Sequence, residues 1–418
     1  MNVLVVGGGG REHAICVALA KSPRIKKLYC APGNGGISQV AQCVDIAATD
    51  IDGMIAFAKN SDIDFVMVAP DDPLALGMVD ALDEANIPAF GPKKSAALIE
   101  SSKIFSKNLM KKYNIPTANY EVFTDVDSAK SYIQKNGAPI VIKADGLALG
   151  KGVIVAMDEN TAINAVDSMM LDGKFGDSGK QVVIEEYMTG PEVTVLAFTD
   201  GNTVVPMLSS QDHKRALTGD KGLNTGGMGA FAPSPNYTEE IHSICMKTIF
   251  EPTIKAMKKE NRPFKGVIYF GLMLTPNGPK VIEYNARFGD PETQAVLPML
   301  KTDLFDIFEA VVQERLHEID IKWHDGACCC VVIASGGYPE SYKIGYEIKG
   351  LDNIPDDITV YHAGTAVSDS TYTTKGGRVL GVTAMCDNVT EAATRAYDGV
   401  SLISFKDMHY RTDIGKTP

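Results

Sequence analysis

Short apolar runs alternate with amphipathic helical patterns from residue 1 to about residue 92. Residues 3–6 read as a buried strand, residues 11–21 place their apolar side chains on one helical face, and residues 64–70 read as a second buried strand. This alternation is typical of a parallel sheet covered by helices, because parallel strands need a long crossover connection. The sequence therefore predicts an N-terminal α/β domain built on a parallel sheet.

The chain is 418 residues long, which allows roughly two to four domains of about 100–200 residues each. Hydrophobic residues make up 45% and charged residues 22% of it, as in an ordinary soluble globular protein. The formal net charge of −12 disfavours nucleic acid and membrane surfaces as partners, because neither polyanion would be attracted. A local cluster of lysine, arginine and Mg²⁺ can offset this field, so the charge does not exclude a nucleotide ligand.

Eight cysteines occur without a Cys-x-x-Cys pair, and Cys328, Cys329 and Cys330 are consecutive. Consecutive side chains of a strand point to opposite faces, so we interpret these three as small core residues in a reducing compartment. Residues 1–7 lack the basic segment of a signal peptide, and no run approaches ~20 apolar residues. We therefore expect a cytoplasmic location.

Four glycines, Gly7 to Gly10, and Arg11 lie between the first predicted strand and its helix. This segment does not match the dinucleotide-binding motif G-x-G-x-x-G, because the third glycine of the motif is missing. The next strand also ends without an acidic residue to bind a ribose hydroxyl. Both observations disfavour an NAD-dependent dehydrogenase. Glycines that open a helix still present free N–H groups and a positive dipole end. A phosphomonoester could therefore bind there beside Arg11. The alternative is a simple tight turn.

The second block runs to about residue 322. We expect a helix over residues 94–112, then a strand that ends in Lys143 and a glycine-rich loop that contains Lys151. Such a loop can cover a polyphosphate with its backbone N–H groups, and the two lysines would supply positive charge. It does not match the Walker pattern. An ordinary hairpin with solvated lysines is the alternative that spacing alone leaves open.

Residues 281–292 begin as a strand with Glu283, Asn285 and Arg287 on one face, and Ile282 and Tyr284 on the other. A carboxylate, an amide oxygen and a guanidinium in one row suit a metal ion that bridges phosphates beside a carboxylate substrate. The Gly-Asp-Pro-Glu sequence that follows ends the strand and adds two acids nearby. An edge strand with a polar outer face is the alternative.

Three other segments carry weaker signals. Residues 182–188 form an apolar strand that meets two acids, which suits either the hinge of an adenine site or a strand end with surface acids. Residues 210–215 combine both charge signs with an imidazole, and residues 224–230 form a glycine-rich turn that a ligand could approach closely. A solvated loop explains either of the last two singly.

The third block, from about residue 327, opens with the cysteine-rich strand. Short strands, glycine turns and a predicted helix near residues 390–401 follow. This pattern predicts a small α+β domain.

Several of these motifs, in this order, resemble the phosphoribosylamine–glycine ligase family of the ATP-grasp superfamily over essentially the whole chain. The matching segments are residues 9–14, 142–148 with 150–153, 211–215, 224–230 and 285–292. The last two of these segments distinguish this family from other ATP-grasp enzymes.

The resemblance implies an α/β and α+β multidomain protein. It comprises an N-terminal parallel-sheet α/β domain at residues 1–102, a central ATP-grasp fold at 103–322 with a mobile lid at about 119–190, and a C-terminal α+β domain at 323–418 that helps to close the active site. The implied reaction joins glycine to 5-phosphoribosylamine with ATP and gives glycinamide ribonucleotide, ADP and phosphate, the second step of de novo purine synthesis. Mg²⁺ or Mn²⁺ is the implied metal. The chain would be a monomer or dimer, and the preceding pathway enzyme could hand over the labile amine.

The resemblance also assigns residues to roles. Catalytic roles fall on Lys143, Asp212 and Arg287, with Arg287 for the carboxylate of glycine and Asp212 for an amine. The metal ligands are Glu283 and Asn285. The ATP-binding set is Lys103, Lys143, Gly150, Lys151, Gly152, Glu185, Glu186, Met188 and Glu192. The set for glycine and the sugar phosphate is Gly9, Gly10, Arg11, Asp71, Asp212, Lys214, Gly226, Gly227, Met228, Arg287, Asp290, Pro291 and Glu292.

The chain departs from the family pattern at Asp71, where a glutamate is usual, and at Leu149 and Leu223, where a small residue and a proline are usual. The shorter Asp71 makes a contact to the sugar hydroxyls doubtful, and the two leucines remove no group that the mechanism requires. Two other functions are compatible with parts of the sequence. One is another ATP-grasp ligase or a biotin-type or purine carboxylase, and the other is a non-catalytic nucleotide-binding protein.

Overall fold

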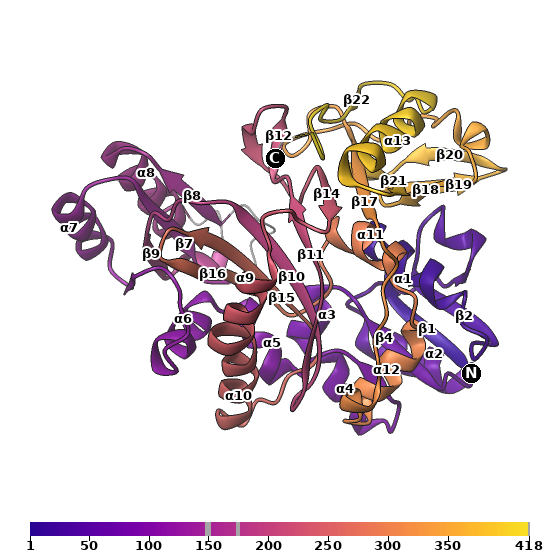
Figure 1. Cartoon of the computed structure of the whole chain (residues 1–418), viewed down its shortest axis with the longest axis horizontal. Coiled ribbons are helices and arrows are strands. Elements are labelled where there is room, and N and C mark those ends of the chain that lie inside the picture. The colour runs from indigo at the N-terminus through magenta and orange to yellow at the C-terminus, as the bar shows by residue number, and fades with distance from the viewer. Residues whose placement is uncertain (147–151, 173–175, 417–418) are drawn as a thin grey trace.

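The computed structural model describes residues 1–146, 152–172 and 176–416 (Figure 1). The N-terminal domain contains a five-stranded parallel sheet with the strand order β3-β2-β1-β4-β5, as predicted from the alternation of strands and helices. Its strands are β1 (Asn2–Gly7), β2 (Lys27–Pro32), β3 (Gln42–Cys43), β4 (Phe65–Val68) and β5 (Ala89–Phe90).

Both faces of this sheet are covered, so its strands are apolar throughout. Leu4 and Val6 pack in one core cluster, while Val3 and Val5 pack in another, as the period of two along a strand requires. The helices of this part are α1 (Gly10–Leu19), α2 (Ile51–Asn60), α3 (Asp71–Leu76), α4 (Met78–Glu84) and α5 (Lys94–Ser101).

The single helix predicted over residues 94–112 is wrong, because Ser102 divides it. Ser102 adopts an extended backbone with φ −134° and ψ 111°, and its hydroxyl accepts a hydrogen bond from the amide of Phe105 at 3.1 Å. A serine that caps in this way begins a new helix, α6 (Lys103–Lys112). The break makes Lys103 the first residue of α6. A similar interruption at Gly77, whose φ is +98°, separates α3 from α4.

A four-stranded antiparallel sheet with the order β6-β9-β7-β8 forms a separate lobe within the predicted lid (Figure 1). It has its own core, in which Ile142 and Ile184 of the sheet pack against Ile133 and Val166 of two helices. Its elements are β6 (Tyr120–Phe123), β7 (Ile140–Ala144), β8 (Val153–Ala156), β9 (Val182–Glu186), α7 (Val126–Asn136) and α8 (Glu159–Met170).

The third sheet joins the central and C-terminal parts of the chain through the order β16-β15-β10-β11-β14-β17-β21-β18, with β22 on β17. Its strands are β10 (Glu192–Asp200), β11 (Val204–Asp212), β14 (Gly229–Ala232), β15 (Lys265–Thr275), β16 (Gly278–Asn285), β17 (Ala327–Ser335), β18 (Ile358–His362), β21 (Arg378–Cys386) and β22 (Met408–His409). Two hairpins accompany it, β12 (Arg215–Leu217) with β13 (Lys221–Asn224) and β19 (Thr365–Ser368) with β20 (Thr371–Thr374).

The helices of these parts are α9 (Glu239–Cys245), α10 (Glu251–Lys259), α11 (Glu292–Val296), α12 (Leu304–Val312) and α13 (Val389–Leu402). The last confirms the helix expected near residues 390–401. In β17, Cys328 and Cys330 pack in the core cluster shared with the N-terminal sheet, and Cys329 packs in the C-terminal cluster. The three cysteines therefore alternate between two cores, as predicted.

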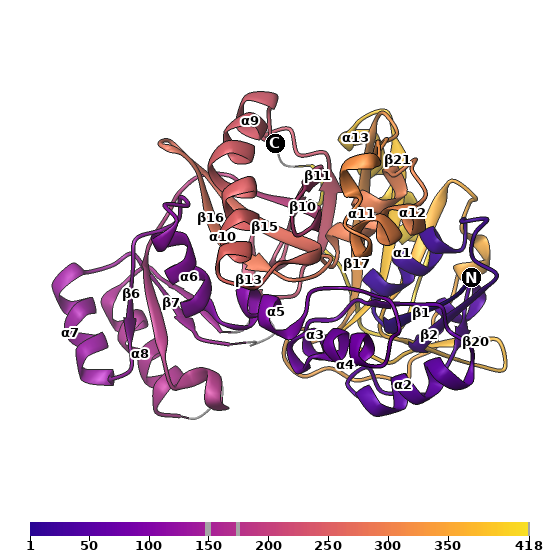
Figure 2. The same ribbon diagram turned by 90° about the horizontal axis from the view of Figure 1, so that it is seen from below.

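Seen from below, the lobe of α7 and α8 stands apart from the N-terminal domain, with β15, β16, α9 and α10 between them (Figure 2). Within the part of the chain that the structure describes, no helix has the length and apolar character needed to cross a membrane.

Candidate active site

A cavity of about 1070 Å³ is lined by side chains from all three parts of the chain. Most of the residues predicted from the sequence line it. They are Arg11, Asp71, Lys103, Lys143, Gly152, Glu185, Glu186, Met188, Glu192, Asp212, Lys214, Gly226, Glu283, Asn285, Arg287, Asp290 and Glu292. The structure thus brings together segments that the sequence separates by more than half its length.

Five predicted residues lie behind this wall rather than on it: Gly9, Gly10, Gly227, Met228 and Pro291. A Cβ on Gly227 would meet Pro291 Cδ at 2.4 Å and Asp212 Oδ1 at 2.8 Å, and φ there is +111°. Only glycine fits this close approach. Two further predicted residues, Gly150 and Lys151, lie outside the described residues.

One end of the cavity, here called the lysine end, consists of Lys103, Lys107, Lys143 and Glu185. Lys103 donates a hydrogen bond from Nζ to the carbonyl of Gly146 at 2.8 Å, where the glycine-rich segment begins. The carboxylate of Asp145 accepts from the amide of Ile104 at 3.0 Å, which anchors that segment to the start of α6. Burial lowers the pKa of Lys103, because desolvation disfavours its charged form.

Glu185 pairs with two ammonium groups at this end. Its Oε1 lies 2.9 Å from Lys143 Nζ, and its Oε2 lies 3.0 Å from Lys107 Nζ. Lys143 also donates to the carbonyl of Ile282 at 3.1 Å. The contact of Glu185 with adenine stays a prediction, and in this structure both of its oxygens already face lysines.

Glu283 and Asn285, the predicted metal ligands, lie at the end of β16 beside this group. Strand β16 carries a bulge, because Gly271 pairs with Glu283 whereas Leu272 pairs with Val281. The bulge leaves Ile282 as an extra residue, and Val281 instead packs with Tyr284 in one core cluster, so the expectation that Ile282 shares a face with Tyr284 is wrong.

Lysines surround the carboxylate of Glu283. Lys214 Nζ lies 3.7 Å from Glu283 Oε1 and 3.1 Å from Glu192 Oε2. Burial opposes ionisation of Glu283, but Lys214, Lys143 and Lys103 outweigh it and hold its pKa below the usual range. The carboxylate is therefore ionised and able to bind a cation.

The other end of the cavity, here called the arginine end, consists of Arg11, Arg287 and Arg378 with their partners Glu12, Glu100 and Asp290. Arg287 Nη2 lies 3.1 Å from both Glu100 Oε1 and Asn285 Oδ1. Burial disfavours the charge of Arg287, but Glu100 and Asp71 outweigh it and raise the pKa above its ordinary value. The Nε of Arg287 is buried and has no hydrogen-bond partner among the described residues.

Asp212 and Glu292 form an acidic pair near Arg287. Burial and the neighbouring Glu292 raise the pKa of Asp212 well above its usual value, and burial raises that of Glu292. Within the described residues, Asp212 Oδ1 has no hydrogen-bond partner. An unsatisfied buried carboxylate on a cavity wall is suited to accept a proton or bind an amine.

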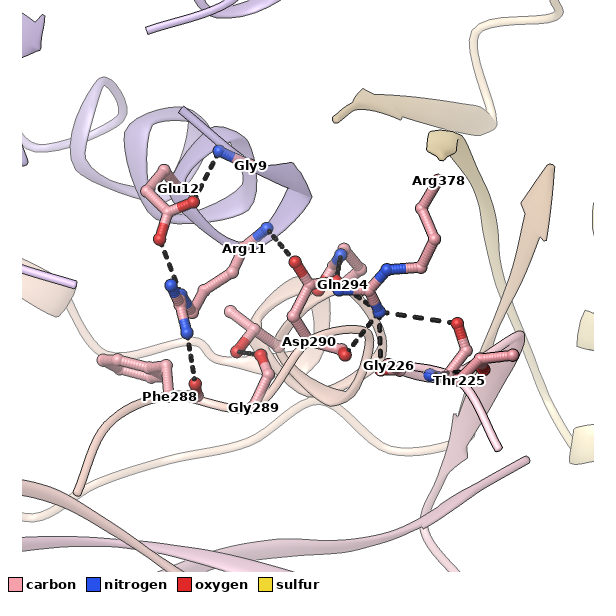
Figure 3. Close-up of polar contacts among 12 residues, drawn as sticks. Gly9, Arg11, Glu12, Thr225, Gly226, Phe288, Gly289, Asp290, Gln294 and Arg378 are labelled. Atoms are coloured by element: carbon pink, nitrogen blue, oxygen red, sulfur yellow. Dashed lines mark hydrogen bonds and ion pairs between the residues drawn. The ribbon is translucent and has the colours of Figure 1, made fainter. Parts of the chain in front are cut away.

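Figure 3 shows how Asp290 connects the three parts of the chain at the arginine end. Arg378, from β21, donates from Nη1 to the carbonyls of Gly226 at 2.6 Å and Asp290 at 2.7 Å, and lies 3.4 Å from Asp290 Oδ1. Arg11 is nearly buried, and its side chain binds Glu12 at 2.6 Å and the carbonyl of Phe288 at 3.2 Å (Figure 3). The arginines therefore fix the backbone that carries the acids.

His13 forms a further link between the N-terminal and C-terminal parts. Its Nδ1 accepts a hydrogen bond from the amide of His362 at 2.7 Å. Burial and the nearby His362 lower the pKa of His13 to about 3, so the ring stays neutral and accepts this bond. Residues 9–13 thus join the N-terminal and C-terminal parts through His13, and Arg11 lines the cavity.

The sequence interpretation missed Glu100, Lys107 and Arg378. Glu100 and Lys107 looked like ordinary polar positions of a helix, and only their burial and long-range partners distinguish them. Arg378 lies among the glycine turns of the third block, for which the sequence pattern indicates only a structural role.

Three family models match the chain in succession. They are the N domain of phosphoribosylglycinamide synthetase at residues 1–100, its ATP-grasp (A) domain at residues 101–293 and its C domain at residues 328–417. The chain belongs to the phosphoribosylamine–glycine ligase family. The resemblance stated from the sequence is thereby confirmed, and so is the assignment of the chain to the ATP-grasp ligases.

Curated members of the phosphoribosylamine–glycine ligase family are similar over their full length. The chain is 49% identical to the one from Halalkalibacterium halodurans, over 99% of this chain and 96% of that protein. It is 46% identical to the one from Caldanaerobacter subterraneus, over 99% of both. The crystal structure of the family member from Thermotoga maritima matches with a TM-score of 0.84 at 31% identity, over 99% of this chain and 100% of that one.

The biotin carboxylase domain of the 2-oxoglutarate carboxylase from Hydrogenobacter thermophilus shares the fold. It matches with a TM-score of 0.76 at 16% identity, over 98% of this chain and 91% of that one. At this identity the likeness concerns the fold alone, so it does not favour a carboxylase reaction.

Proposed function

We propose that this chain joins glycine to 5-phosphoribosylamine with ATP and releases glycinamide ribonucleotide, ADP and phosphate. The observation that carries the proposal is that one cavity holds both a lysine-rich end and an arginine end. The first suits a polyphosphate and the second suits a small carboxylate. Membership in the family supports the choice of substrates.

ATP would bind at the lysine end. Lys103 and Lys143 would hold the polyphosphate as point charges, and Glu192 would bind the ribose hydroxyls. Adenine would lie near Glu186 and Met188, on the cavity wall beside the four-stranded sheet. The closure that the sequence predicts for the glycine-rich loop falls on residues 147–151, outside the described residues.

Glu283 and Asn285 suit Mg²⁺ or Mn²⁺ as oxygen donors on the cavity wall. Among the described residues, no group of three or more His, Cys, Asp or Glu side chains could hold a metal alone. This fits an ion that completes its coordination with phosphate oxygens and water, as Mg²⁺ usually does. When bound, the metal would neutralise charge on the transferred phosphoryl group.

Arg287 would hold the carboxylate of glycine, because its planar guanidinium can bind two oxygens at once. One carboxylate oxygen attacks the γ-phosphorus, and the bond from that phosphorus to the bridging oxygen breaks, which releases ADP. The product is glycyl phosphate, whose phosphate is a far better leaving group than oxide. The chain's contribution to this step is alignment and charge stabilisation.

The amine of phosphoribosylamine then attacks the carbonyl carbon of glycyl phosphate. A C–N bond forms, the C–O bond to phosphate breaks, and the amine loses one proton. Asp212 is the proposed acceptor of this proton, because its Oδ1 has no hydrogen-bond partner among the described residues and its raised pKa makes it a better base. The sugar phosphate would bind near the N-terminus of α1, with Gly9, Gly10 and Arg11, and Asp71 would face the sugar hydroxyls.

The remaining substrate-binding residues would act around this centre. Lys214, Asp290 and Glu292 line the cavity, while Gly226, Gly227, Met228 and Pro291 shape the turn that positions them.

We further propose a cytoplasmic location, supported by eight free thiols, six of them buried. Transfer of the labile amine from the enzyme that makes it is also a proposal.

Release of ADP by the purified chain tests this function. Mg-ATP, glycine and phosphoribosylamine generated in situ are supplied together and then omitted one at a time. We expect ADP only when all are present, with glycinamide ribonucleotide detected by mass. ADP that requires bicarbonate in place of glycine would identify a carboxylase. ATP binding without turnover under any combination would identify a non-catalytic protein.

A further inference from the structure

Lys107, Glu185 and Lys143 form a buried charge triad at the lysine end, of which the mechanism above uses only Lys143. Lys107, on α6, is 2% exposed and lines the cavity. Its Nζ lies 3.0 Å from Glu185 Oε2 and donates to Thr117 Oγ1 at 2.8 Å. The other oxygen of Glu185 lies 2.9 Å from Lys143 Nζ. One carboxylate therefore bridges two ammonium groups.

The charges of this triad add to one net positive charge. If Glu185 faced Lys143 alone, the pair would be neutral and Lys143 would attract a polyphosphate only weakly. Because Lys107 occupies the other oxygen of Glu185, the triad keeps a positive charge next to the cavity. Charges in a site with little water act strongly on one another, so one ammonium group more or less matters.

Stability does not explain the presence of Lys107. Burial lowers its pKa to about 8, and Glu185 counteracts only part of that shift. A buried ion pair often contributes no more stability than apolar side chains of the same size. The other charged or titratable groups that face Lys107 are Lys143, Glu186 and Tyr120, whose ring centre lies 5.8 Å from Nζ. A lysine on a cavity wall whose pKa is shifted by burial and by a charged partner is a candidate for a functional role.

We infer that Lys107 is a positioning residue for ATP, which acts by sharing Glu185 with Lys143 so that Lys143 keeps its charge for the polyphosphate. The inference rests on the proposed function, because that function assigns ATP to the lysine end. Lys107 acts through the charge balance of the triad and not through the shape of its side chain.

Charge-balanced substitutions test this inference. Lys107→Met makes the triad neutral, and adding Glu185→Gln to it restores one net positive charge on Lys143. We expect Lys107→Met to raise the Kd for Mg-ATP, measured by calorimetry, about tenfold, and the double variant to return to within about threefold of the unmodified chain. The KM for glycine should stay unchanged in both variants.

Lys111→Met, at an exposed position of the same helix, is the matched control, and thermal unfolding of every variant confirms folding. A folded double variant that binds Mg-ATP as weakly as Lys107→Met would overturn the inference, because charge balance would then not matter. Normal binding by Lys107→Met would overturn it as well. If the unmodified chain does not bind Mg-ATP, the proposed function itself fails, which separates the two failures.

Discussion

The lysine end and the arginine end of the cavity differ in how their charges are balanced. At the lysine end, Lys107 and Lys143 share the carboxylate of Glu185 while Lys103 bonds to a backbone carbonyl, and burial lowers the pKa of Lys103 and Lys107. At the arginine end, three guanidinium groups face three carboxylates, and the carboxylates hold the pKa of Arg378 above its usual value against the effect of burial. One end has a surplus of positive charge, and the other is balanced.

This difference indicates that the two ends of the cavity bind different kinds of ligand. Ammonium groups act as point charges without a fixed hydrogen-bonding plane, so a surplus of them attracts a highly charged ligand such as a polyphosphate. Balanced guanidinium–carboxylate pairs instead fix the backbone and hold planar acceptors in one orientation. We therefore expect substitutions at the lysine end to change affinity for ATP, and substitutions at the arginine end to change the use of glycine and the amine.

The largest effect should come from Glu283, which lies between the two ends. Glu283→Ala removes the carboxylate proposed to hold the metal, and turnover should fall at least about 10³-fold, because the charge of the transferred group is no longer neutralised. Release of ADP measures the effect. Glu240→Ala, at an exposed position of α9, is the control. Turnover within tenfold of that of the unmodified chain would show that Glu283 is not a required metal ligand.

Arg287→Lys should have the next largest effect. The variant keeps a positive charge beside Glu100 but loses the planar fork, so the KM for glycine should rise about 30-fold while the KM for ATP stays the same. Steady-state kinetics with each substrate varied in turn checks this, and Arg395→Lys, at a surface pair with Asp357, is the control. An unchanged KM for glycine would contradict the role of Arg287. A raised KM for ATP would show that the two ends of the cavity do not bind their ligands independently.

Arg378→Gln should have a smaller effect, confined to the arginine end. Loss of the bonds to Gly226 and Asp290 loosens the turn and the acid that face the sugar substrate, so the KM for phosphoribosylamine should rise about tenfold. The matched substitution Arg395→Gln should change nothing. An equal rise in the KM for ATP would show that Arg378 supports the whole cavity rather than one end of it.

The smallest effect concerns pH. Because burial holds the pKa of Lys107 at about 8, its charge is present below that pH and is lost as the pH rises through it. The Kd for Mg-ATP should therefore rise about threefold between about pH 7 and about pH 9, whereas the guanidinium groups stay charged throughout. Calorimetry at both pH values measures this. Lys107→Met should show no such change, and an equal response in that variant would assign the titration to another group.

The sequence predicted the lysine end better than the arginine end, for a physical reason. Lys143 and Glu185 lie near the ends of strands, where local patterns place them, whereas Lys103 begins a helix whose start the pattern did not predict. The arginine end depends on contacts between distant segments, such as the amide of Arg11 and Asp290, which are 279 residues apart. No local periodicity specifies such contacts, so Glu100 and the role of Arg378 were not predicted.

The local structure also differs from the sequence patterns at two places. The hydroxyl of Ser102 divided an otherwise continuous helical pattern, and the bulge in β16 placed Val281 instead of Ile282 in the core beside Tyr284. The fold class nevertheless followed from the sequence, and most of the predicted site residues line one cavity, because apolar periodicity and clustered glycines, lysines and acids survive such local changes.

The central claim is that a carboxylate held at the arginine end receives the phosphoryl group held at the lysine end. Turnover with glycine labelled with ¹⁸O in its carboxylate, followed by mass analysis of the phosphate, tests this directly. The account predicts one ¹⁸O atom in each phosphate released, because the attacking oxygen of glycine leaves with the phosphoryl group. Phosphate without label, released together with glycinamide ribonucleotide, would contradict it, because the oxygen lost from the carboxylate of glycine would then have left in another form.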